Sequence, residues 1–294
     1  MISLHEDQAA GLRRLFDNAQ PRIITFATGG AKVGKSALVA NLASSIANWN
    51  KNVLIIDENA ENNTASYFGL EASRDLQDIV DGRHSLDEVI LDPVRGVRIM
   101  PATTLVQKLD MFDARQQKTL LEAFLNLSSP GDIILVDMSP DYPLGFSPLG
   151  LASQDIVIVV SATESAIMDS YALIRKVSLA YSRKHFHVLM NNASSLDEAV
   201  GIFSNMAELT YKRGLAHLEY AGFIPHDENL YKASCLYQPV ETLFPGSPSA
   251  RAYRKIAYDL CHWPFPEEEA RGLEQFVQQL LHLSHQIDPV AIYA

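Results

Sequence analysis

The residues best suited to chemistry form one stretch, Gly29-Gly30-Ala31-Lys32-Val33-Gly34-Lys35-Ser36, which fits the pattern G-x-x-x-x-G-K-[ST]. In this pattern glycines turn backbone N–H groups toward a polyphosphate, and the start of the next helix adds partial positive charge. We predict that Lys35 reaches the β- and γ-phosphates and that Ser36 ligates Mg²⁺. The alternative is a glycine-rich turn that binds nothing.

The segments on either side of this stretch favour phosphate binding. Residues 22–28 are β-branched and apolar, as expected of a buried parallel strand. Residues 36–50 place apolar side chains at helical spacing. A strand, a glycine loop and a helix are the context that the motif requires.

Two further carboxylates are expected near this loop. Asp57 ends the apolar strand 53–57, and Asp137 ends the apolar strand 132–137. Open α/β sheets bind ligands at the carboxyl ends of their strands, so both side chains should face the phosphates. The second segment has the Walker B form, in which one carboxylate serves the outer shell of Mg²⁺. Ser36, Asp57 and Asp137 are therefore the predicted metal residues.

Strands and helices alternate along most of the chain. Strands are expected at 22–28, 53–57, 97–101, 132–137, 155–160, 186–190 and 218–224, and helices at 36–50, 75–80, 85–90, 113–127, 168–182, 196–213, 249–262 and 267–285. This order predicts an α/β fold: a doubly wound, mostly parallel sheet of about seven or eight strands with helices on both faces. No linker is evident, so we expect one domain over 21–262.

The composition limits the partners. A net charge of −11 disfavours non-specific nucleic-acid binding, which needs a basic face, and also adsorption to an anionic membrane by charge alone. Cys235 and Cys261 lack metal-ligand spacing, which favours idle thiols in a reducing compartment. No N-terminal signal pattern and no apolar run approaching 18 residues occur, so a cytoplasmic protein is expected.

The two terminal segments are treated separately from the domain. Residues 1–20 contain a marginal amphipathic helix, either a partner-binding segment or a helix that docks or frays. Residues 263–294 contain an apolar helical face that could lie on a membrane, but its polar face is acidic. Packing of this helix on the domain is therefore favoured over a peripheral membrane position.

Several motifs together are similar to those of a known family. They are the glycine loop, Asp57, Asp137, Ala162-Thr163-Glu164-Ser165, Met168-Asp169-Ser170-Tyr171-Ala172 and Gly222-Phe223-Ile224-Pro225-His226-Asp227. Over about residues 20–262 they resemble the MinD/ParA class of deviant-Walker P-loop ATPases. Upstream, Asp7-Gln8-Ala9-Ala10-Gly11-Leu12-Arg13 resembles the D-Q-A-x-x-L-R element of the FlhG/FleN group, which limits flagellar number and placement.

The resemblance implies a ligand, partners and residue roles. It implies ATP or ADP with Mg²⁺, an ATP-dependent homodimer, and action on the flagellar signal-recognition-type GTPase and a flagellar transcriptional regulator. The implied partner-binding residues are Asp7, Gln8, Ala9, Leu12 and Arg13, and the implied nucleotide-binding residues are Gly29, Gly30, Ala31, Lys32, Val33, Gly34, Lys35, Ser36, Ala37, Asn191, Pro225 and Asp227. Asn191 would read the adenine, because its amide matches the donor and acceptor of that base; a capping role is the alternative.

Two positions depart from the family pattern. The family carries a lysine, which acts on the neighbouring subunit's phosphates, where this chain has Gly30; a lysine appears two residues later, at Lys32. The family's D-x-D segment is Asp57-Glu58-Asn59 here, and Asn59 can orient a water but cannot accept its proton. The implied catalytic residues are Lys35, Asp57, Asn59, Asp137 and Lys32, and the departures predict slow hydrolysis.

Two other functions stay open at this stage. A division-site or partition ATPase would share the fold, although the charge of −11 is a handicap for DNA binding and the terminal helix lacks a basic face. A pseudo-ATPase, whose bound nucleotide only sets its shape for protein binding, fits the same motifs. For this protein a cytoplasmic location is expected, with a peripheral position at the cell pole or inner membrane as the alternative.

Overall fold

The structure is a computed structural model that describes residues 21–30, 33–61, 63–127, 131–140, 142, 146–264 and 273–286. The expected partner-binding segment within residues 1–20 lies outside this part, and so do Ala31 and Lys32 of the glycine loop.

The described residues form one eight-stranded sheet in the order β3-β4-β2-β5-β1-β6-β7-β8. The strands are β1 Arg22–Ala27, β2 Val53–Asp57, β3 Leu91–Val94, β4 Val97–Pro101, β5 Ile133–Asp137, β6 Asp155–Ser161, β7 His185–Ala193 and β8 His217–Pro225. Neighbouring strands run parallel except β3, which pairs antiparallel with β4 at the sheet edge. The predicted doubly wound α/β fold is therefore confirmed.

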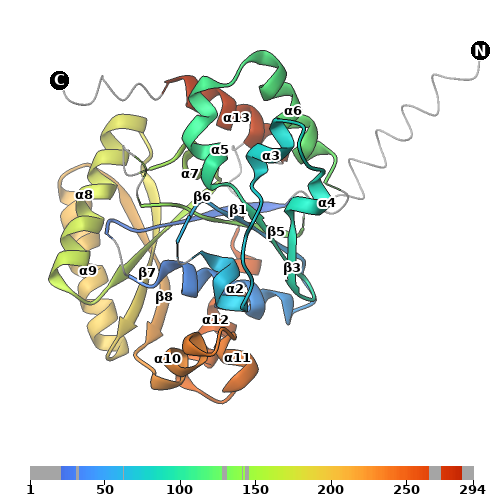
Figure 1. Cartoon of the computed structure of the whole chain (residues 1–294). Helices are drawn as coiled ribbons and strands as arrows, with labels where there is room; N and C mark the ends of the chain where they lie inside the picture. Colours follow the sequence, from blue (N-terminus) through green and yellow to red (C-terminus); the bar gives the residue numbers. More distant parts are fainter. Residues whose placement is uncertain are drawn as a thin grey trace, which may run out of the picture.

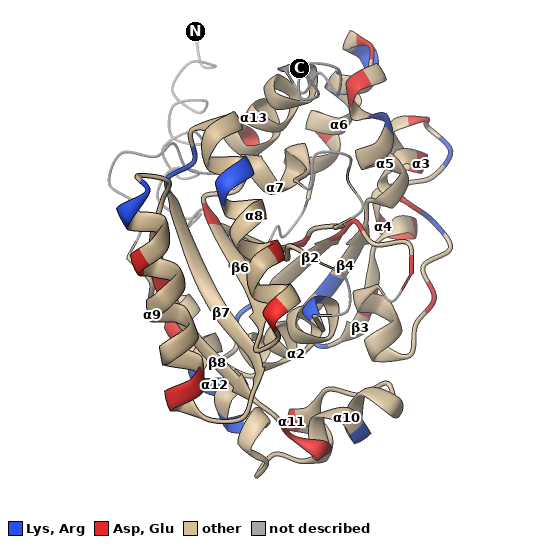
Figure 2. Cartoon of the chain, turned by 90° about the vertical axis from the view of Figure 1, so that its left-hand side faces the viewer, with Lys and Arg blue, Asp and Glu red and all other residues tan. Residues whose placement is uncertain are grey.

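Helices cover both faces of this sheet (Figure 1). The α-helices are α2 Lys35–Ala47, α3 Leu76–Val80, α4 Leu86–Val89, α5 Thr103–Lys108, α6 Ala114–Leu125, α7 Pro148–Ala152, α8 Glu164–Tyr181, α9 Leu196–Lys212, α10 Glu228–Cys235, α11 Val240–Leu243, α12 Pro248–His262 and α13 Leu273–Gln286. Two 3₁₀ helices, η1 Thr64–Phe68 and η2 Leu109–Met111, complete the set. In Figure 2, α9 shows acidic residues toward its start and basic residues at its end, which suits the helix dipole.

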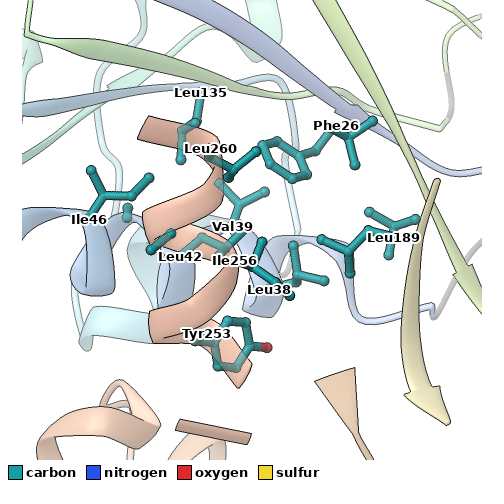
Figure 3. Packing of buried hydrophobic residues seen from close by; sticks show 14 of the residues in the cluster. Phe26, Leu38, Val39, Leu42, Ile46, Leu135, Leu189, Tyr253, Ile256 and Leu260 are labelled. Carbon is teal, nitrogen blue, oxygen red and sulfur yellow. The ribbon is translucent and has the colours of Figure 1, made fainter. Parts of the chain in front are cut away.

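One face of the sheet packs against α2 and α12. Figure 3 shows Phe26 and Leu135 from the sheet meeting Leu42 of α2 and Ile256 of α12, all of them buried. Helix α2 follows the glycine loop directly and is packed between the sheet and α12. This packing fixes the direction of its first turn.

The opposite face carries two groups of helices. The β6–β8 half packs against α8 and α9, and the β4-β2-β5-β1 half packs against α3, α5, α6, α7 and α13. In α13, Phe276, Val277 and Leu280 are buried against this second group. The packed alternative is therefore the one observed for residues 273–286, since the apolar face of α13 is covered by protein.

The differences from the predicted elements have local causes. The edge strand β3 was missed because it is short, contains Pro93 and pairs irregularly with β4. The short helices α5, α7, α10 and α11 were missed because four to eight residues are too few for a clear helical period. Helix α8 begins at Glu164, with Thr163 as its N-cap, so the predicted start at 168 was four residues late.

Candidate functional site

The glycine loop joins β1 to α2 at the carboxyl edge of the sheet. Gly34 caps α2 with φ of 82°, a left-handed conformation that favours glycine. A Cβ atom at Gly29 would lie 2.2 Å from the backbone carbonyl carbon of Asp169 in α8. Both glycines therefore have a structural role: Gly34 allows the left-handed turn, and Gly29 allows α8 to approach the loop closely.

Lys35 and Asp137 form a buried ion pair at the centre of this edge. The side chain of Ser36 lies close enough to lower the pKa of Asp137. Burial raises the pKa of Asp137 to about 6, against the lowering effect of the Lys35 charge. The structure thus brings together three of the residues that the motifs predicted, although Lys35 and Asp137 are 102 residues apart.

Asp57 is held in place by residues of its own loop. Its Oδ1 accepts hydrogen bonds from the backbone and side-chain N–H groups of Asn59, both at 2.9 Å. Its Oδ2 accepts from the backbone N–H and the hydroxyl of Thr64, at 2.5 and 2.6 Å. Thr64 was not among the predicted site residues, because a threonine at the end of a polar loop carries no motif.

Asn59 connects the two predicted metal carboxylates. Besides Asp57, its Nδ2 donates to the carbonyl oxygen and to Oδ2 of Asp137, at 2.9 and 3.0 Å. An amide can bridge two carboxylates in this way, whereas an aspartate at this position would add a third negative charge. The water-orienting role of Asn59 stays a prediction.

Glu58 is a site residue that the sequence analysis missed. Its carboxylate is buried and accepts from the Ser147 hydroxyl at 2.5 Å and from the Ser139 backbone N–H at 3.0 Å. Burial raises the pKa of Glu58 to about 7, although these two hydrogen bonds act in the opposite direction. An acidic residue directly after an apolar strand at the ligand-binding edge is the signal that could have found it.

The charges at this edge fit a divalent cation that arrives with a nucleotide. Asp57, Glu58 and Asp137 are all buried, and Lys35 is the buried cation among them. Mg²⁺ is usually held by one or two carboxylates, waters and substrate phosphates rather than by an all-protein cage. Consistently, the described residues contain no cluster of three or more His, Cys, Asp or Glu that would hold a metal alone. Ser36, Asp57 and Asp137 are the residues that would receive it.

Asn191 lies against the glycine loop, as its proposed role requires. Its Nδ2 donates to the carbonyl oxygen of Val33 at 2.8 Å, across 158 residues of sequence. Its Oδ1 is buried, and no described residue donates to it. A buried carbonyl oxygen without a partner is costly, and a ligand with an amino group would remove that cost. Strand β7 continues to Ala193, so Asn191 lies within the strand rather than at its end.

Pro225 and Asp227 lie next to this strand but have structural partners. Pro225 ends β8 opposite Ala193. Asp227 caps α10 by accepting from Asn229, and it also accepts from the backbone N–H and hydroxyl of Ser249. The described contacts do not join either residue to the glycine loop, so their nucleotide role stays a prediction.

The position of the family lysine has an acidic neighbour. A Cβ atom at Gly30 would lie 2.9 Å from Oδ2 of Asp169, an exposed residue of α8. A carboxylate therefore stands beside the place where the family carries a cation.

Cys235 and Cys261 are free thiols; Cys235 is exposed and Cys261 is half-buried. In the described part of the chain, no helix combines the length and apolarity that crossing a membrane requires.

Comparison with known proteins agrees with the fold. The sequence model of a family described as an AAA domain matches residues 21–189. The antiactivator FleN of Pseudomonas aeruginosa is 30% identical over 261 residues, which cover 88% of this chain and 93% of FleN. Among solved structures, the MinD cell division protein of Aquifex aeolicus aligns with a TM-score of 0.63 at 22% identity, over 84% of this chain and all of that one. MinD of Pyrococcus horikoshii, solved with Mg-ADP, aligns with a TM-score of 0.59 at 18% identity, over 82% of this chain and 96% of that one.

The fold and the site together define a P-loop nucleotide-binding protein. Within that class, the matched family model and the similarity to FleN place this chain in the MinD/ParA family of ATPases.

Proposed function

We propose that this protein is an ATP-binding, MinD-like regulator of flagellar number and placement that hydrolyses ATP slowly. The observation that carries the proposal is the contrast within one site. The residues proposed to bind phosphate and Mg²⁺ in cis, Lys35, Ser36 and Asp137, lie together at one edge of the sheet, whereas two positions linked to hydrolysis differ from the family pattern. The similarity to FleN supports the flagellar role.

Slow hydrolysis follows from what Gly30 and Asn59 cannot do. Glycine supplies no cation to a neighbouring subunit's phosphates, and Asp169 adds negative charge beside that position. Asn59, whose side-chain amide donates hydrogen bonds to both Asp57 and Asp137, cannot take a proton from water. A trans-acting cation can contribute about 10³-fold or more to phosphoryl transfer.

Single-turnover hydrolysis tests this part of the proposal. We expect Mg-ATP to bind to the wild type while hydrolysis is slower than in ordinary MinD-type ATPases by at least about 100-fold, and Gly30→Lys with Asp169→Ala to raise the rate. A wild-type rate equal to those enzymes would refute slow hydrolysis. A large rate loss in Lys32→Ala would instead show that Lys32 replaces the missing cation.

The partner is proposed to be the flagellar signal-recognition-type GTPase, bound through Asp7, Gln8, Ala9, Leu12 and Arg13. ATP is proposed to drive formation of a homodimer. The protein would act in the cytoplasm or at the inner membrane near the cell pole, with a flagellar transcriptional regulator as a second partner. Support for a protein-binding role comes from the similarity to FleN, an antiactivator.

A pull-down with the GTPase tests the partner. Deletion of residues 7–13 should abolish capture of the GTPase. As a control, substitution of Glu228 and Lys232, which form an exposed ion pair on α10, should leave capture unchanged. Unchanged capture after the deletion would contradict the flagellar proposal and leave a division-site or partition ATPase as the next candidate.

A further inference from the structure

Glu58 joins three segments of the site. Its Oε2 accepts from the backbone N–H of Ser139 at 3.0 Å, and its Oε1 accepts from the hydroxyl of Ser147 at 2.5 Å. Its own backbone N–H donates to the carbonyl oxygen of Asp137 at 3.1 Å. One side chain thus links the end of β2 to the end of β5 and to the start of α7.

The two carboxylate oxygens of Glu58 already have donors, and the side chain is 2% exposed. A carboxylate at this place is costly to bury, and it accepts from two donors at once. A glutamine could still accept from the Ser139 N–H, but its NH₂ group would then face Ser147, whose hydroxyl would have to accept instead of donate. This arrangement suits an anchor for backbone better than a base for water.

The anchored groups lie next to the residues that would meet Mg-nucleotide. Ser139 is two residues beyond Asp137, whose carboxylate is paired with Lys35. Ser147 caps α7 by accepting from the N–H of Gly150 at 2.9 Å, and α7 packs against β1 and α13. Holding both points fixes the direction in which the chain leaves Asp137.

We propose that Glu58 is a positioning residue for the nucleotide site: it holds the backbone after Asp137 so that the Asp137 carboxylate keeps its place for Mg²⁺. This inference rests on the proposed Mg-nucleotide binding. It predicts that Glu58 and Ser147 act as one unit, although they are 89 residues apart.

Hydrogen exchange of the nucleotide-free full-length protein tests the anchor directly. In Glu58→Gln, the Ser139 amide and the amides of residues 149–152 should exchange about tenfold faster, because a neutral amide replaces the carboxylate that accepts these hydrogen bonds. Ser147→Ala should speed exchange in residues 149–152. Glu61→Gln, which changes an exposed acidic residue of the same loop, should leave these amides unchanged.

The Mg²⁺ dependence of ADP affinity tests the positioning role. We expect the ratio of dissociation constants in EDTA and in Mg²⁺ to fall about tenfold in Glu58→Gln and about threefold in Ser147→Ala, with the double variant no worse than Glu58→Gln. Glu61→Gln should keep the wild-type ratio. A purely structural loosening would weaken both affinities equally and leave the ratio unchanged.

Three results would overturn the inference. One is an unchanged Ser139 amide in Glu58→Gln. Another is additive effects of the two substitutions, which would show that they act separately. The third combines two observations. Glu58→Gln loses hydrolysis while its ratio of dissociation constants in EDTA and in Mg²⁺ is unchanged, and Ser147→Ala changes neither quantity. That result would make Glu58 a base. If the wild type binds no nucleotide, the proposed function fails, and the exchange data alone decide whether Glu58 holds Ser139.

Discussion

The two ends of the sheet differ in how their buried charged residues are paired. At the amino edge, Arg22 of β1 donates to Asp155 of β6 at 2.7 Å and to the carbonyl oxygens of Trp263 and Pro264 at 2.6 and 3.2 Å. His187 stacks on Trp263 at 3.9 Å between ring centroids. At the carboxyl edge, Lys35 pairs with Asp137, and Asp57 and Glu58 are further buried carboxylates at the same end of the sheet.

We interpret the amino edge as a structural cluster and the carboxyl edge as a ligand-binding site. At the amino edge each charge has a partner within the chain, and the cluster fastens the segment after α12 to the sheet. At the carboxyl edge three buried carboxylates stand against one buried cation, Lys35, although each carboxylate accepts hydrogen bonds from within the chain, and Asn191 Oδ1 has no described donor. An excess of buried negative charge and an unpaired buried oxygen are both costly to a folded protein unless a ligand completes them.

The largest expected effect would come from breaking the amino edge. Arg22→Ala leaves Asp155 buried without its strongest partner, so it should lower the free energy of unfolding by about 3–5 kcal/mol. Urea denaturation measures this change. Arg83→Ala, which removes an arginine from exposed ion pairs with Asp78 and Asp81, should cost less than about 1 kcal/mol. An equal cost in both variants would contradict the structural role of the Arg22 cluster.

Lys35→Ala breaks the other edge and should affect ligand binding. The phosphates lose a charge-assisted donor, so ATP affinity should fall by about 100-fold, or about 3 kcal/mol, in a calorimetric titration. Lys51→Ala is the matched control, because Lys51 lies on the surface and pairs only loosely with Asp132 at 3.5 Å. Loss of ATP affinity in Arg22→Ala to the same degree would remove the distinction between the two edges.

The amino edge should also show a pH dependence. Burial alone would raise the pKa of Asp155, but hydrogen bonds from His187 and Arg22 hold it below its ordinary value. A lowered pKa means that the ionised carboxylate stabilises the fold above the ordinary aspartate pKa and that this contribution is lost as pH falls through the lowered value.

Asp155→Asn should accordingly cost about 1–3 kcal/mol at pH 7 and less at pH 3, because pH 3 lies below the ordinary aspartate pKa of about 3.9, where the contribution of the ionised carboxylate declines. Urea midpoints of both proteins at the two pH values measure the difference. The same cost at both pH values would mean that the charge of Asp155 contributes little.

The smallest expected effect concerns the unpartnered amide. Asn191→Ala removes both the contact to Val33 and the oxygen that a base amino group would use, so adenine nucleotide affinity should fall about tenfold. Asn205→Ala, at an exposed position of α9, is the control. Competition between ATP and GTP gives a sharper readout, because the loss should be smaller for GTP. Equal losses for both would assign Asn191 to the loop rather than to the base.

The sequence could predict the parts of this site that are contiguous. Residues 29–36 follow a strict local pattern, and Asp57 and Asp137 end strongly apolar strands, so strand order alone brings them to one edge. The hydrogen-bond partners of Glu58 could not be predicted in this way, because Ser139 and Ser147 are 81 and 89 residues away. Arg22 looked like an ordinary strand residue for the same reason: its partners lie 133 or more residues further on.

The central claim is that the carboxylates at the carboxyl edge of the sheet bind a cation together with the nucleotide. The metal dependence of nucleotide binding tests this claim most directly. ATP affinity of the full-length protein should be measured in Mg²⁺ and in EDTA. We predict that Mg²⁺ tightens ATP binding by at least about tenfold and that Ser36→Ala with Asp137→Asn removes this gain. Equal affinities with and without Mg²⁺, or no ATP binding at all, would contradict the account.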